Sequence, residues 1–448
     1  MVCRARVRLI LLISAAVATV SVAGAPQSPI PANVLAATLD QTVPVDPLIT
    51  VGMLPNGLRY YIRANRQPQA RAELRLVVNA GSVLEDDDQR GLAHFVEHMS
   101  FNGTLHFPGN GVVNFMQALG VRFGARGNAS TSFDETVYEL QIPTDNPAVI
   151  DRSFLVFEDF AHNVTFDPVE IDKERGVILE EWRLGLGADA RMRDAQFPLL
   201  FKGSRYAARL PIGSSDIIRN VNHDRLKQFY ADWYRPDLMA VTAVGDFDTS
   251  AIEAQIRSHF GSIPATLSPK PRPAYTVPDQ PGTVYSVITD PEATSTRIEV
   301  TRKMAARPQS TIGQYRQGMV ERLFSIMLSA RLDEIAQTPN APFLRAQTDR
   351  SLVVRAEEAT TLEALVTPGG VERGLAALFT EVDRVARFGF TATELGREKL
   401  NLQRGLQRGV VEKDKSPSGP LADEFVRNFI HAEPIPGIVY EYGLNQRF

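Results

Sequence analysis

The segment GLAHFVEHMSFNGT (91–104) places His94, Glu97 and His98 within five residues of one another, although the whole chain contains only 7 histidines. On a helix, residues four apart project from nearly the same face, so both imidazoles can reach one point with the glutamate beside them. Two imidazoles and a carboxylate within reach of a bound water are the parts of a hydrolytic zinc site. The pattern predicts such a site, and a polar helix face without metal is the alternative.

A catalytic zinc site commonly has three protein ligands and one open position, so one ligand is still missing. The other histidines of the chain do not occur in a ligand-like pattern, which favours a carboxylate. The acidic segment 168–184, predicted to be helical, offers five of them: Glu170, Asp172, Glu174, Glu180 and Glu181. Spacing on its own does not choose among these five.

The elements that must position these residues are strands and helices without strict alternation, which indicates an α+β domain. We expect strands near 58–65, 72–82, 136–142 and 238–247, and helices near 91–101, 148–164, 168–184, 223–234 and 249–261. Together they predict a catalytic domain over residues 48–263. Six prolines in 264–282 then predict a linker.

Beyond the linker the order begins again, and the sequence carries traces of an internal repeat. FDPVEIDKER (166–175) matches FTATELGREK (390–399) at an offset of 224, and TVYELQIP (136–143) resembles TLEALVTP (361–368) at 225. The same offset of 224 places Gly318 and Arg322 opposite the two histidines of the motif. We therefore expect a second, non-catalytic homologous domain over 283–448, and one zinc ion per chain.

The N-terminus has the layout of a secretory signal peptide over residues 1–25: arginines, a short apolar stretch, then small residues. An uncleaved anchor is the alternative, and residues 26–47 are predicted to be a linker or loosely ordered lead-in. Cys3, the only cysteine, would leave with the signal, which excludes disulfides and cysteine chemistry. The formal net charge of −4 gives a nucleic-acid or membrane partner no electrostatic support. We expect an exported protein, periplasmic or secreted in a bacterium.

Several ordered motifs resemble the pitrilysin/insulysin family of zinc metallopeptidases, in which H-x-x-E-H is the inverzincin signature. They are GLAHFVEHMSFNGT, NASTSFDETVYEL (128–140), EIDKERGVILEEWR (170–183), LPIG (210–213) and FYADWYRPDLMAVTAVGDFD (229–248). The resemblance covers residues 48–445 and is greatest to exported bacterial members. It implies two tandem similar α+β domains, each a mostly antiparallel sheet packed with helices, the first catalytic and the second inert.

The resemblance also implies roles for individual residues. His94 and His98 would ligate zinc, and Glu97 would be the general base. The family's third ligand is a glutamate some 74–76 residues beyond the motif, which corresponds to Glu174, with Glu181 as the second choice. An acidic residue seven positions before the ligand supports it in the family and corresponds to Asp167. Asn128 and Ala129 match the edge strand that pairs with the substrate backbone.

The predicted function is therefore that of an exported zinc endopeptidase acting on peptides or unstructured polypeptides. Family members work as two such domain pairs that close round a chamber, and this sequence contains one pair. The alternative is a half-enzyme or non-catalytic subunit that binds peptides or assembles with a partner supplying the other pair. A fragment of a longer enzyme is the third interpretation.

Overall fold

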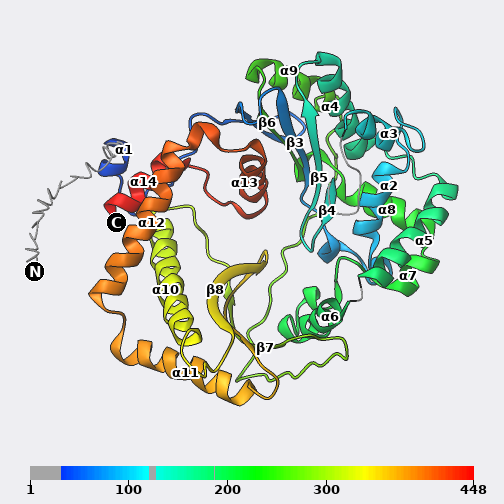
Figure 1. Ribbon diagram of the computed structural model, residues 1–448. Helices are drawn as coiled ribbons and strands as arrows, with labels where there is room; N and C mark the ends of the chain where they lie inside the picture. Colours follow the sequence, from blue (N-terminus) through cyan, green and yellow to red (C-terminus); the bar gives the residue numbers. More distant parts are fainter. Residues whose placement is uncertain (1–31, 121–127, 186) are drawn as a thin grey trace, which may run out of the picture.

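The computed structural model describes residues 32–120, 128–185 and 187–448, arranged as two halves that each combine a β-sheet with helices (Figure 1). The predicted signal peptide (1–25) lies outside the described residues. Within the described ranges, no helix is both long enough and apolar enough to cross a membrane.

The first half contains a six-stranded sheet with the strand order β1-β2-β6-β3-β5-β4. The strands are β1 (Thr50–Met53), β2 (Arg59–Ala64), β3 (Arg71–Val78), β4 (Ala129–Thr131), β5 (Thr136–Pro143) and β6 (Met239–Gly245). The α-helices are α2 (Leu92–Phe101), α3 (Gly111–Ala118), α4 (Pro147–His162), α5 (Pro168–Leu184), α6 (Ala188–Leu200), α7 (Ser215–Asn220), α8 (His223–Trp233) and α9 (Thr249–Phe260). Neighbouring strands run antiparallel except β2 and β6, which confirms the predicted sheet type.

Both faces of this sheet are covered, as the alternation of its buried residues requires. Leu74 and Leu76 of β3 point into the large core beneath the helices of the first half. Val77, next to them, points to the opposite face, where Phe425 and Ile430 cover it. Those two residues belong to α13 (Ser418–His431), which Figure 1 shows beside β3 and β6. A helix of the second half thus covers one face of the first sheet.

The second half repeats the order of the first, with a three-stranded antiparallel sheet in the order β7-β9-β8. Its elements are β7 (Thr296–Ala305), α10 (Ile312–Ala336), β8 (Arg345–Val354), β9 (Glu357–Val366), α11 (Val371–Phe388), α12 (Ala392–Val411), α13 and α14 (Ile438–Arg447). The helices α11 and α12 begin 224 residues after α4 and α5 respectively, which matches the offset of the sequence repeat. The two tandem α+β domains predicted from the sequence are confirmed.

From residue 32, where its described part begins, the lead-in differs from the prediction of a linker or loosely ordered segment over residues 26–47. It contains α1 (Ala32–Ala36), and Val34, Ala37 and Val43 are 0%, 2% and 6% exposed. These side chains form a small core with α10 and with Leu444 of α14. The proline and alanine content suggested a linker, but an apolar residue every few positions is enough to seat the segment on the second half.

Candidate metal centre

The helix α2 presents the H-x-x-E-H motif because its apolar side chains fix it in the core. Leu92, Phe95, Val96 and Met99 are all 0% exposed. The helix begins after Gly91, whose φ of +105° is a left-handed conformation that favours glycine. A Cβ on Gly213, in the LPIG motif, would lie 2.2 Å from the Cα of Gly91, so two glycines allow this close approach.

A buried glutamate that the sequence did not reveal as a site residue caps this helix. One carboxylate oxygen of Glu85, Oε1, accepts hydrogen bonds from the backbone N–H groups of Gly91 (3.0 Å) and Ala93 (2.8 Å). Burial raises the pKa of Glu85 to about 8, although these two hydrogen bonds act in the opposite direction. Its place in a loop of consecutive acidic residues gave no periodic signal, so only the fold identifies it as a cap.

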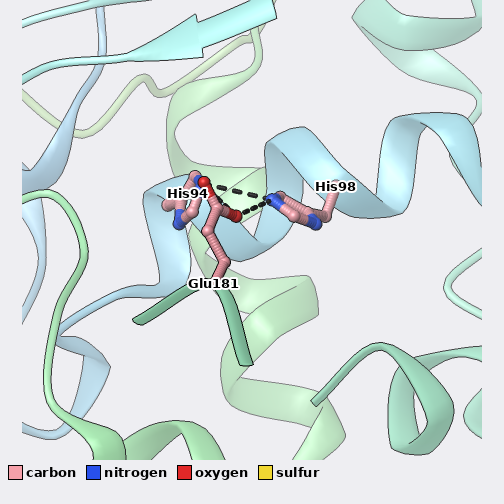
Figure 2. A group of neighbouring side chains, drawn as sticks. All are labelled: His94, His98 and Glu181. Atoms are coloured by element: carbon pink, nitrogen blue, oxygen red, sulfur yellow. Dashed lines mark hydrogen bonds and ion pairs between the residues drawn. The ribbon is translucent and has the colours of Figure 1, made fainter. Parts of the chain in front are cut away.

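Two histidines and one glutamate direct their side-chain atoms at a common point (Figure 2). The Nε2 atoms of His94 and His98 lie 3.1 Å apart. The Oε2 atom of Glu181, from α5, lies 3.7 Å from Nε2 of His94 and 3.3 Å from Nε2 of His98. A tetrahedral zinc ion holds neighbouring ligand atoms about 3.3 Å apart. The three residues therefore fit zinc and leave a fourth position open.

Glu174 occupies a different place from the one predicted for it. Its Oε1 atom lies 2.7 Å from Nδ1 of His98, the ring nitrogen that faces away from His94, and its Oε2 accepts from Asn102 at 2.8 Å. A carboxylate in this position orients the ring and leaves Nε2 for the metal. Of the two glutamates, Glu181, the second choice from the sequence, reaches the Nε2 side of both rings, and Glu174 does not.

Asp167, for which the resemblance implied a supporting role, is exposed and lies at the beginning of α5. Its Oδ1 atom accepts hydrogen bonds from the backbone N–H groups of Val169 (2.8 Å) and Glu170 (3.2 Å), so it caps the helix. Glu174, seven residues before Glu181, is the acidic residue that contacts His98.

The expected general base lies beside the ligand set and is held from the edge of the sheet. Glu97 is 8% exposed, and its Oε2 accepts a hydrogen bond of 2.5 Å from Oγ1 of Thr131, the last residue of β4. Burial raises the pKa of Glu97 to about 7, although the hydrogen bond from Thr131 acts in the opposite direction. A carboxylate with this pKa can both accept and return a proton near neutral pH.

The two histidines differ in the absence of a metal. Burial and the neighbouring His98 lower the pKa of His94 to about 4. Burial also acts to lower the pKa of His98, but its hydrogen bonds to Glu174 and Glu181 outweigh burial and raise that pKa to about 9. Near neutral pH the pair therefore carries one proton more than two neutral imidazoles, and a metal ion must displace this extra proton.

The predicted substrate-binding residues lie at the edge of the first sheet. Ala129 begins β4 and pairs with Tyr138 of β5, while on the other side of β4 the described residues contribute no neighbouring strand. Asn128 is 5% exposed, and its backbone carbonyl accepts from the N–H of Glu139 at 2.7 Å. The strand can thus offer backbone groups to an extended peptide, whereas the side chain of Asn128 points inward.

The sequence was compared with known families and proteins. A family model described as Insulinase (Peptidase family M16) matches residues 60–184, and one described as Peptidase M16 inactive domain matches residues 220–402. A protein named Zinc protease PQQL-like from Arabidopsis thaliana is 34% identical over 396 residues, which cover 88% of this chain and 38% of that protein. A Probable zinc protease PqqL from Haemophilus influenzae is 32% identical over 415 residues, covering 91% of this chain and 44% of that one.

A solved structure extends this likeness to the fold. The crystal structure of the first half of the periplasmic protease PqqL from Escherichia coli superposes with a TM-score of 0.86 at 28% identity, covering 91% of this chain and 87% of that chain. The chain spans less than half the length of the curated relatives described above. With an active-type domain followed by an inactive-type domain, and with the inverted histidine motif on α2, the chain belongs to the insulinase (M16) family of peptidases.

Proposed function

We propose that this chain is the zinc-binding half of an exported metallopeptidase that hydrolyses peptides or unstructured polypeptides. The observation that carries the proposal is the convergence of His94, His98 and Glu181 on one point, with Glu97 buried beside them. We propose these three residues as the ligands of one zinc ion. A zinc ion bound in such a set lowers the pKa of a bound water to about 7 and polarises a carbonyl oxygen.

The residues of the chain itself supply the proton transfers and the orientation. Glu97 accepts a proton from the attacking water and donates it to the nitrogen of the leaving amine. Thr131 fixes one oxygen of this carboxylate, which leaves the other free for the proton. Glu174 keeps the ring of His98 in the orientation that its ligand role requires.

The substrate would bind as an additional strand beside β4, through the backbone of Ala129, because the backbone carbonyl of Asn128 already accepts from β5. The edge position of this strand and its direct contact with Glu97 through Thr131 support this mode. Backbone pairing requires an extended segment, which favours unstructured polypeptides over folded proteins as substrates.

A second candidate is a half-enzyme that binds zinc but needs a partner, or a further segment of chain, for hydrolysis. The observation that favours it is the length of the relatives, of which this chain spans 38% and 44%. Export rests on the signal-type sequence of residues 1–25. The mass of the mature protein, recovered from the periplasm of an expressing bacterium, would test cleavage after Ala25.

The decisive experiment measures bound zinc and the hydrolysis of an unstructured fluorogenic peptide by the full chain. We expect about one zinc per chain, hydrolysis that a chelator abolishes and zinc restores, and loss of both properties in His98→Ala. Zinc binding without hydrolysis would favour the half-enzyme. A wild-type chain that binds no zinc would refute the ligand assignment.

A further inference from the structure

The hairpin of β8 and β9 in the second half reaches into the first half. Val354, the last residue of β8, is 5% exposed and belongs to the core of the first domain, and Val353 packs against that core. The next residue, Arg355, stands at the tip of the hairpin. Val353 and Val354 thus anchor the inert domain in the catalytic domain, and the positively charged Arg355 follows them at the tip.

Arg355 contacts two residues of the first half. Its Nη1 donates to Oδ1 of Asn79 at 2.7 Å. Its backbone N–H donates to Oδ2 of Asp134, and its Nη2 donates to the backbone carbonyl of Asp134, both at 3.3 Å. Because Asp134 is 4% exposed, its charge depends on partners that the protein supplies.

Two further groups complete the surroundings of Asp134. The hydroxyl of Tyr206 donates to both carboxylate oxygens, at 3.2 and 3.1 Å. Arg272, from the proline-rich linker, donates through Nη2 to Oδ1 of Asp134 at 3.3 Å. The carboxylate is therefore held from three directions, by the catalytic domain, by the linker and by the second half.

Asp134 lies in the turn between β4 and β5, three residues after Thr131, which donates to Glu97. The turn also bonds to its own domain, because the N–H of Ser82 donates to the carbonyl of Ser132 at 3.1 Å. Of these contacts, those of Arg355 alone come from the inert domain. They connect that domain to Glu97 through one short segment of backbone.

We propose that Arg355 is a positioning residue for Glu97. Through Asp134 it holds the β4–β5 turn, and the turn keeps Thr131 within hydrogen-bonding distance of the glutamate. The effect on catalysis rests on the proposed function, whereas the effect on the turn does not. The second half has lost the metal residues, but its hairpin has kept a role in the geometry of the active site.

Hydrogen exchange of the zinc-loaded full chain tests the mechanical part. The variants are R355Q and the control R345Q, which alters an exposed arginine of β8 whose ion pair with Glu363 is 3.9 Å long. We expect amides of residues 129–136 to exchange about tenfold faster in R355Q and at the wild-type rate in R345Q. Unchanged exchange in R355Q would overturn the proposal. Should R355Q not fold, R355K takes its place, because an ammonium lacks the guanidinium fork that reaches Asn79 and Asp134 through two different nitrogens.

A double-mutant cycle with T131V tests the connection to Glu97. If Arg355 acts through Thr131, R355Q and T131V each lower kcat about tenfold with unchanged zinc content, and the double variant loses little more than T131V alone. Additive losses would refute the positioning role. If the wild type cleaves no peptide, the proposed function fails, and the exchange experiment still decides whether Arg355 holds the turn.

Discussion

The two halves share one succession of elements but surround their carboxylates differently. Glu97 and Glu321 show this difference most clearly. The offset of 224 places Glu321, on α10, at the position of Glu97. In the first half the carboxylate is buried next to a neutral donor, and its pKa rises to about 7. In the second half burial acts in the same direction, but hydrogen bonds from Arg307 and Gln317 and the charge of Arg350 outweigh it and lower the pKa of Glu321.

This contrast shows what separates a reactive site from a structural one in a shared fold. The position of Glu181 is taken by Gly405 in the second half, and the position of Glu174 by Glu398, which bonds to Arg397 and Asn401. Arginines thus neutralise the carboxylates of the inert half. The first half leaves its carboxylates to histidines and to the zinc ion that we propose, an arrangement that would stabilise the fold less and permit chemistry.

The largest expected effect comes from the two glutamates at equivalent positions. E97Q removes the proton carrier, so we expect kcat for peptide hydrolysis to fall about 10²- to 10⁴-fold while zinc content stays the same. E321Q removes only a partner of Arg307 and Arg350 and leaves kcat within about twofold. Steady-state kinetics with zinc-loaded proteins decide this, and an equal loss in both variants would break the comparison.

The second prediction separates the ligand from the carboxylate that supports it. E181Q removes a charged ligand and should weaken zinc binding by more than E174Q, for which we expect about a 10- to 100-fold loss. Competition with a chromophoric chelator measures both affinities. A larger loss of zinc affinity in E174Q than in E181Q would favour Glu174 as the ligand and contradict the placement of the two side chains on α5.

The third prediction concerns the ion pairs that hold the inert half. Arg331 donates to Glu381 at 3.0 Å and to Glu394 at 2.5 Å, with side-chain exposures of 10%, 4% and 19% for the three residues. Removing one partner of a buried pair costs about 3 kcal/mol, so R331A should lower the denaturation midpoint clearly. Zinc affinity should stay unchanged. A loss of zinc in R331A would mean that the halves are not energetically separate.

The smallest effect is the pH dependence of zinc binding. Because the pKa of His98 is raised to about 9 and that of His94 is lowered to about 4, one proton must leave when zinc binds between these values. Affinity should therefore rise about tenfold for each pH unit between pH 6 and 8. Calorimetry in buffers of different ionisation enthalpy should show about one proton released per zinc. No proton release would contradict the role of Glu174 as partner of His98.

Most of the fold followed from local patterns. The alternation of β3 and β5, the helix of the motif and the offset of 224 all reflect short-range periodicities that the sequence displays directly. The seating of α13 on the first sheet could not be predicted in this way. It depends on contacts between residues more than 300 positions apart, such as Tyr61 with Asn428, whose side chains lie 2.8 Å apart.

The structure brings together the local part of the candidate site as expected, but it places Glu181 rather than Glu174 nearest to both histidine Nε2 atoms. His94, Glu97 and His98 share one helix, so their spacing fixes their relation. Glu174 and Glu181 are seven residues apart, which is nearly two whole helical turns, so both face α2. The loops between the motif and α5 can easily vary in length. The number of intervening residues therefore does not select between Glu174 and Glu181.

A narrower prediction was available from the helix itself. Ile171 and Ile178 are 0% exposed and form one stripe with Glu174 and Glu181. That stripe restricts the candidates for the third ligand to carboxylates that face the core. Asp172 lies off the stripe and bonds to His223 at 2.8 Å.

The lead-in also has a consequence for the order in which the chain can fold. Val34 and Ala37 rest on α14, and Arg447 donates to the carbonyl groups of both residues. During synthesis, α14, on which this segment packs, is made some 400 residues after the segment itself. Contacts so distant in sequence form late. Residues 34–43 would therefore stay unpacked until both α10 and α14 have been made.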